Sequence, residues 1–197
     1  MKALIGVLLM VVPMSLAQAQ WSDENMMGLF FSASEFTDAT TNLDTAGFPF
    51  NAYIVILNPE LETIGGYEVG VSFSDPLVIP LSAQGPNGWT TEGDYLNQIV
   101  SFDTAVPVVD DSAVLCTLQL LYTGEAMVEI CFGPADPTSL PDHEGAVLIS
   151  GNDGDDLIPC VNPLGEGVGC LVATLNNDSP GPAVEQTAWT TVKTLFR

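Results

Sequence analysis

The sequence predicts an all-β protein, an antiparallel β-sandwich, on the basis of three observations. Short apolar runs recur along the chain, and several alternate with small or polar residues, as a strand with one buried face requires. Turn-forming pairs such as Asn58-Pro59, Asp75-Pro76 and Gly133-Pro134 separate these runs. No long helical period occurs before residue 183. Many short strands with regular turns between them are typical of a sandwich.

The first 19 residues have the features of a signal peptide. Lys2 precedes an apolar run over residues 3–12, and Ala17-Gln18-Ala19 is the small-x-small pattern that signal peptidase accepts. We therefore expect a mature chain that begins at Gln20 and is exported to the medium, the cell surface or the periplasm. An uncleaved N-terminal anchor is the alternative. No later segment is long and apolar enough to span a membrane, so we expect no membrane insertion of the mature chain.

Residues 20–175 are enough for one domain with a sizeable core. The run AYIVIL (52–57) is apolar on both faces, which favours the centre of a sheet. In residues 67–73 the odd positions are apolar and the even positions are small or polar. The other expected strands cover residues 28–33, 77–83, 96–102, 113–122, 127–132, 146–149 and 169–175.

The runs 113–122 and 127–132 are expected to pair as a hairpin. A three-residue connection separates apolar from polar residues cleanly, but it places Cys116 on the apolar face and Cys131 on the polar face. A two-residue connection brings Cys116 and Cys131 opposite each other, yet it mixes Glu129 with Leu118. A β-bulge would reconcile the two arguments.

Four cysteines in an exported chain indicate two disulfides, for which three connectivities exist. We favour Cys160–Cys170, which would close the loop VNPLGEGVG, and Cys116–Cys131 across the expected hairpin. Zinc is the weaker interpretation, because the spacings are not paired CxxC motifs and the sequence has one histidine.

The charge balance excludes some partners. The net charge is −22, and between Ala3 and Val192 the sequence has no Lys or Arg. Such a surface repels phosphate backbones, so we expect no nucleic-acid binding, and anionic membranes are disfavoured for the same reason. A surface suited to high salt, a cation-binding surface and a surface for a basic partner remain as interpretations.

The C-terminal segment differs from the rest. Residues 176–182 (NNDSPGP) resemble a linker. In residues 183–197 the apolar Trp189, Val192 and Phe196 fall on one helical face, and Lys193 and Arg197 lie near the end, as the helix dipole favours. We expect a short amphipathic C-terminal helix or tail packed on the domain, with a docking or sorting signal as the alternative.

The acidic stretch GNDGDDLI (151–158) is the candidate cofactor site. It is similar to one unit of a calcium-binding nonapeptide repeat, in which glycines let carbonyl and carboxylate oxygens converge on the ion. Asp153, Asp155 and Asp156 are the expected calcium ligands. Because the repeat occurs once and Asx-Gly pairs also form ordinary turns, an acidic turn between two strands is the competing interpretation.

Two aromatic residues form a candidate ligand-binding site. Trp89 lies in an expected loop with Tyr95 nearby, and an exposed ring there would suit a glycan. Trp89 could instead fold back as a lid on the sandwich edge.

Catalytic motifs are weak. His143 is the one histidine and is expected in a surface loop. No G-x-S-x-G elbow occurs. With 25 acidic residues, carboxylate pairs arise by chance and do not indicate glycoside hydrolysis. We therefore expect no enzyme and no catalytic residue.

The elements from Asn58 to Tyr122 resemble a cohesin-type domain. The stretch GGYEVGVSFSDPLVIPLSA (65–83) has two strands joined by an Asp75-Pro76 turn, and NQIVSFDTAVPVVDDSAVLCTLQLLY (97–122) has two strands joined by an acidic turn. This resemblance covers about half of the mature chain. It implies a jelly-roll sandwich, related to some carbohydrate-binding modules, and a role in binding rather than catalysis. The C-terminal half departs from the pattern, so no partner-binding residue is transferred. The whole chain is similar to exported bacterial proteins.

Taken together, the sequence predicts a secreted, non-enzymatic binding or structural module, with protein–protein adhesion as its role. A carbohydrate-binding module and a calcium-stabilised surface protein are the alternatives. The partner is expected to be a protein or a glycan.

Overall fold

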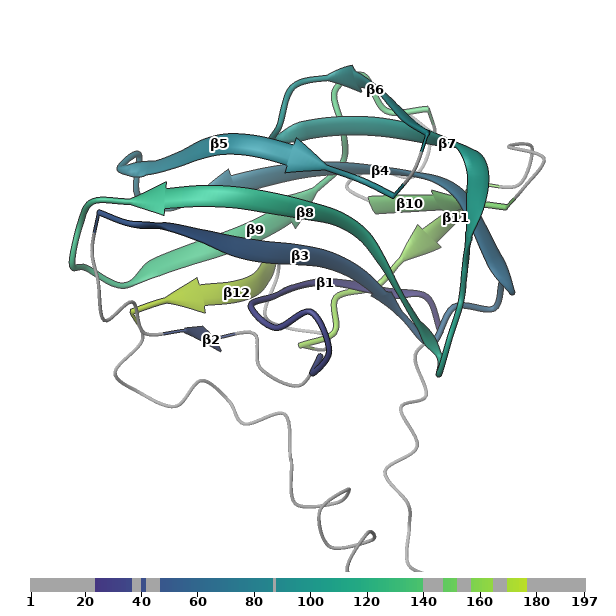
Figure 1. Ribbon diagram of the computed structural model, residues 1–197, viewed down its shortest axis with the longest axis horizontal. Helices are drawn as coiled ribbons and strands as arrows, with labels where there is room; N and C mark the ends of the chain where they lie inside the picture. Colours follow the sequence, from purple (N-terminus) through teal and green to yellow (C-terminus); the bar gives the residue numbers. More distant parts are fainter. Residues whose placement is uncertain are drawn as a thin grey trace, which may run out of the picture.

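The computed structural model describes residues 24–36, 40–41, 47–86, 88–139, 147–151, 157–164 and 170–176, which form two stacked β-sheets (Figure 1). Within these ranges every regular element is a strand. No helix long and apolar enough to cross a membrane occurs among the described residues. The expected signal peptide, linker and C-terminal helix lie outside the described residues and stay predictions.

The first sheet has four antiparallel strands in the order β1-β3-β8-β5. Their bounds are Met26–Phe30 (β1), Pro49–Leu57 (β3), Ser112–Tyr122 (β8) and Val78–Gln84 (β5). β3 lies between β1 and β8, and its Ile54, Val55 and Ile56 are fully buried. The expectation that the run AYIVIL occupies the centre of a sheet is therefore confirmed.

The second sheet is built around β4. Its hydrogen-bonded neighbours form the path β11-β10-β4-β9-β12-β2, and β7 pairs with both β4 and β6. All its pairs are antiparallel except the short parallel contact of β12 with β2. The bounds are Thr40–Thr41 (β2), Thr63–Phe73 (β4), Trp89–Gly93 (β6), Asn97–Pro107 (β7), Val128–Gly133 (β9), Val147–Ser150 (β10), Leu157–Cys160 (β11) and Leu171–Leu175 (β12).

The core lies between the two sheets, because both turn alternate side chains inward. From β4 these are Tyr67, Val69 and Val71; from β8 they include Leu118 and Leu120. Such alternation lets one face of each sheet be buried while the other carries polar residues. The predicted antiparallel sandwich is confirmed.

The expected hairpin between residues 113–122 and 127–132 is wrong. β8 pairs with β3 and β5 in the first sheet, whereas β9 pairs with β4 and β12 in the second. The two strands therefore face each other across the core. The assignment of faces is nonetheless correct, since Cys116 and Ile130 are buried while Cys131 lies at the partly exposed face of β9.

A bulge in β8 was expected for the wrong reason. The register with β3 shifts so that Ile54 pairs with Cys116 and Val55 with Val114, which leaves Leu115 as the extra residue. Leu115 and Cys116 are consequently both buried. The bulge fits β8 to β3 and does not bring two cysteines together.

Three strands were not predicted. β2 is two residues long, and β6 has exposed polar residues after Trp89, so neither has an apolar alternation. β11 contains Pro159, which is tolerated because β11 is an edge strand.

Candidate functional site

The outer face of the four-stranded sheet ends in a group of exposed apolar side chains. Pairing places Pro49, Leu121 and Ile79 in one row across β3, β8 and β5. Ile79 is 43% exposed, and Phe48, just before β3, is 67% exposed. We call the following residues the apolar end: the exposed Phe48, Leu77, Ile79 and Leu81, and the half-buried Leu121. Apolar side chains clustered at a surface in this way often mark an interaction site.

Polar residues continue the same face away from the apolar end. The next row across β3, β8 and β5 is Asn51, Gln119 and Ser82, and the row after it is Tyr53, Thr117 and Gln84. Asn51, Gln119 and Gln84 are exposed. The face thus combines an apolar end with amide and hydroxyl groups that can donate and accept hydrogen bonds.

The local sequence of β5 explains why apolar residues stay exposed there. Strand alternation turns Val78 inward against Tyr122, so the neighbouring Ile79 faces outward. The register then shifts between Pro80 and Ser82, which leaves Leu81 without a partner on β8. Because β5 is an edge strand, this bulge and Pro80 also interrupt its free edge.

A hydrogen-bonded turn holds the start of β5. The Asp75 Oδ1 atom accepts a hydrogen bond of 2.8 Å from the Leu77 N–H. The Tyr122 hydroxyl lies 3.2 Å from Asp75 Oδ2 and 3.0 Å from the Ala126 carbonyl oxygen. These contacts fix Leu77 beside the rest of the apolar end.

The electrostatics of the described surface are uniform in sign. Every Lys and Arg of the sequence lies outside the described residues, so the charged side chains of the described part are all acidic. A surface of this kind favours cations and basic partners.

The structure separates the two predicted aromatic residues. Trp89 begins β6 opposite Phe102, is half-buried and packs against the core. A Cβ atom at Gly85 would lie 2.8 Å from Trp89 Cγ, so the ring covers that glycine. Tyr95 is 45% exposed in the turn after β6, at the opposite end of the strand.

The expected calcium ligands Asp153, Asp155 and Asp156 lie outside the described residues, as does His143. Residues 151–156 connect β10 to β11, which form an antiparallel pair. Within the described part of the chain, no group of three or more His, Cys, Asp or Glu side chains could hold a metal ion. The calcium site stays a prediction.

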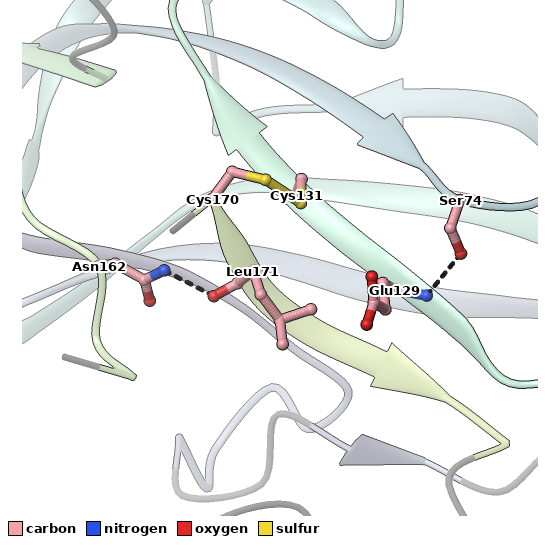
Figure 2. Close-up of a disulfide and its surroundings, with 6 residues drawn as sticks. All are labelled: Ser74, Glu129, Cys131, Asn162, Cys170 and Leu171. Carbon is pink, nitrogen blue, oxygen red and sulfur yellow. Dashed lines mark hydrogen bonds between the residues drawn. A yellow bond between two sulfur atoms is a disulfide. The ribbon is translucent and has the colours of Figure 1, made fainter. Parts of the chain in front are cut away.

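The predicted disulfide pairing is wrong. Cys131 bonds to Cys170 (Figure 2). Cys116 and Cys160 are free thiols. Cys131 cannot reach Cys116, because the two lie on strands of different sheets and Cys116 is buried in the core. Cys170 directly precedes β12, whose Leu171 pairs with Cys131 on β9, and this strand pairing brings the bonded cysteines together.

Sequence reasoning missed the apolar end. The signal was present in VIPLSA (78–83), where apolar residues occupy both faces of an expected strand. In a central strand both faces would be covered, and the sequence did not place this strand at an edge.

The comparisons with known proteins support the fold. The second type II cohesin module of the adaptor ScaA scaffoldin of Acetivibrio cellulolyticus matches with a TM-score of 0.51 and 12% identity, over 86% of this chain and 98% of that one. The sixth cohesin of scaffoldin B of the same organism, solved in complex with a Cel5 dockerin, matches with a TM-score of 0.51 and 7% identity, over 78% and 98%. No protein-family model and no curated protein matches the sequence. The chain therefore has a cohesin-like β-sandwich fold.

Proposed function

We propose that this protein is an exported, non-enzymatic binding module that holds a protein partner on the outer face of its four-stranded sheet. The observation that carries the proposal is the apolar end, with the exposed Ile79 on edge strand β5, next to rows of polar side chains on the same face. Interfaces commonly combine an apolar centre with a polar rim. The expected signal peptide supports export to the medium, the cell surface or the periplasm.

The chemistry of the partner follows from the charge. Because every charged side chain of the described surface is acidic, a partner with apolar side chains flanked by Lys or Arg suits this protein. One protein of the same fold, the scaffoldin B cohesin, was solved in complex with a dockerin, which supports a protein as the partner.

A capture experiment with matched variants tests the proposal. Immobilised wild-type protein is exposed to the exported proteins of its own organism, beside Ile79→Ser on the proposed face and Tyr95→Ser on the other sheet. We expect immobilised wild type and Tyr95→Ser to capture the same exported proteins. For a purified partner, Ile79→Ser should weaken the affinity about tenfold or more, as loss of an apolar anchor residue of an interface does. Equal retention by Ile79→Ser would overturn the proposal.

Glycan binding is a second candidate, favoured by the exposed ring of Tyr95. In a pull-down with soluble polysaccharides, this candidate expects retention by wild type and loss in Tyr95→Ser and Trp89→Ala. Unchanged retention in both variants, or none in wild type, would contradict it.

A further inference from the structure

A split in the second sheet creates a gap between strand ends. β7 pairs along one edge of β4, opposite residues 63–70. The other edge pairs with β10 at residues 66–68 and with β9 at residues 70–73, so β10 and β9 lie end to end. β11 pairs beyond β10 and β12 beyond β9, so these two strands also lie end to end.

Cys160 ends β11 at one side of this gap. It pairs with Val147 on β10. One further residue of the β10–β4 register places Val147 level with Val69. Cys160 packs against the hydrophobic core from this position.

Cys170 stands at the other side of the gap. Its carbonyl oxygen accepts a hydrogen bond of 2.9 Å from the Phe132 N–H, and Phe132 pairs with Val71. Cys160 and Cys170 therefore lie about two residues apart along β4, or about 7 Å at the rise of a strand. Disulfide-bonded cysteines have Cα atoms up to about 6.8 Å apart, so a small movement brings this pair within range.

A cavity occupies the gap and both cysteines line it. Its volume is about 240 Å³, and its wall includes Met27, Val147 and Val172. The Asn162 side-chain amide donates a hydrogen bond of 2.6 Å to the Leu171 carbonyl oxygen (Figure 2). This bond ties the segment after Cys160 to the residue after Cys170, which holds the two cysteines near each other.

We propose that Cys160 is a thiol–disulfide exchange site that acts on the Cys131–Cys170 bond. The Cys160 thiol loses its proton and its sulfur attacks Cys170 Sγ. A Cys160–Cys170 bond forms, the Cys131–Cys170 bond breaks, and Cys131 leaves as a thiolate that takes up the proton. The numbers of thiols and disulfides are unchanged, so the step needs no external oxidant or reductant.

The two forms differ in what they link. Cys131–Cys170 joins the adjacent strands β9 and β12, whereas Cys160–Cys170 joins the ends of β11 and β12 across the gap. Loop closure favours the second form in a loosened chain. Cys160 and Cys170 are 10 residues apart and Cys131 and Cys170 are 39 apart, so the shorter loop closes with a probability roughly eight times higher. The pairing of β12 with β9 favours the first form. The Cys131–Cys170 bond therefore predominates while β12 is paired with β9, and the Cys160–Cys170 bond predominates when that pairing is lost.

Burial limits the rate in the intact protein. It raises the pKa of the Cys160 thiol, so at neutral pH the attacking thiolate is scarce. Loosening of the gap would admit water to the thiol and also favour the Cys160–Cys170 form.

Disulfide mapping across a urea series tests this site independently of the proposed function. Purified protein is incubated at urea concentrations below the unfolding midpoint, quenched with acid, digested with pepsin and analysed by mass spectrometry. We expect a Cys160–Cys170 peptide that increases with urea, with Cys131 free in equal amount. Cys131–Cys170 as the sole disulfide at every concentration would overturn the proposal.

Two variants complete the test. In a glutathione redox buffer, Cys131→Ser should form the Cys160–Cys170 disulfide. If both cysteines of this variant stay as free thiols or as mixed disulfides with glutathione, the exchange is contradicted. Cys116→Ser removes the other free thiol from the core and should leave the exchange unchanged. Should Cys131→Ser fail to fold, the wild-type urea series decides alone.

Discussion

The Tyr67 hydroxyl donates a hydrogen bond of 2.5 Å to the side-chain carbonyl oxygen of Gln98 inside the sandwich. Gln98 is fully buried, and its amide donates a bond of 2.7 Å to the Tyr95 carbonyl oxygen. The Cys116 thiol lies on the opposite sheet, and its charge interacts with that of Tyr67 across the core. A small polar cluster therefore connects the two sheets within the core.

Removal of the tyrosine hydroxyl should destabilise the protein. Tyr67→Phe leaves the buried Gln98 oxygen without this donor, and an unsatisfied buried acceptor costs about 1–3 kcal/mol. Urea unfolding of the variant and of wild type measures the difference. Tyr95→Phe, in which the exposed ring loses the same hydroxyl, should change the free energy of unfolding by less than about 0.5 kcal/mol. Equal effects of the two variants would contradict the role of the cluster.

The same cluster predicts a loss of stability at alkaline pH. Burial raises the pKa of Tyr67 and of the Cys116 thiol. Above about pH 8.5 the unfolded chain releases its thiol proton, and above about pH 10 its tyrosine proton, while the folded protein retains both. The folded state then binds more protons, so its stability is complete below about pH 8.5 and falls as pH rises through the folded pKa values.

Urea unfolding at pH 7, 9 and 10 checks this dependence. We expect the free energy of unfolding to decrease from pH 7 to pH 10, and to decrease less in Cys116→Ser, whose hydroxyl does not titrate in this range. A free energy that stays constant over the series would exclude the effect.

The sequence predicted where strands form better than how they pair. Alternation of apolar residues leaves a direct trace in residues such as Tyr67, Val69 and Val71, which face the core in β4. Pairing leaves no such trace, because β8 and β9 are adjacent in the chain yet belong to different sheets.

The cysteine pairing failed for the same reason. The Cys131–Cys170 bond depends on the pairing of β9 with β12, which are distant in sequence. Local spacing instead favoured Cys160 and Cys170, which do lie near each other at the split in the sheet. The exposed apolar end depended likewise on the edge position of β5, which follows from strand order rather than from residue pattern.

Calcium should raise the melting temperature if Asp153, Asp155 and Asp156 bind it. At about a hundred times the dissociation constant, the ligand would add about 2.7 kcal/mol. Thermal unfolding in calcium, in magnesium at equal ionic strength and in chelator measures this, with Asp156→Ala as the control. Equal rises in calcium and magnesium would indicate general screening of the acidic surface and an ordinary turn.

A buried carboxylate should hold the segment after β9. Glu68 is 6% exposed, and its carboxylate accepts hydrogen bonds from the Ser139 N–H, at 3.0 Å, and from the Ser139 hydroxyl. Glu68→Gln replaces one acceptor oxygen by a donor, so we expect a loss of about 1–3 kcal/mol. Limited proteolysis should show faster cleavage near residues 134–139. Glu129→Gln, on the exposed face of β9, should leave both stability and cleavage unchanged.

Two paired glycines at the end of β9 should respond differently to the same substitution. Gly70 on β4 pairs with Gly133 on β9. A Cβ atom at Gly70 would lie 2.5 Å from the Pro134 carbonyl oxygen, whereas at Gly133 it would meet no atom within 4 Å. Because the obstacle at Gly70 is backbone, Gly70→Ala must displace the chain where it leaves β9, and we expect a loss of about 1–3 kcal/mol.

Gly133→Ala introduces the same methyl group without a clash and restricts the unfolded chain. We expect it to be neutral or to stabilise the protein by up to about 1 kcal/mol. Urea unfolding of both variants measures the contrast, which removes any general effect of replacing a strand glycine. If Gly70→Ala were as stable as Gly133→Ala, the close approach of Pro134 to β4 would not constrain that residue, and the chain could leave β9 by another path.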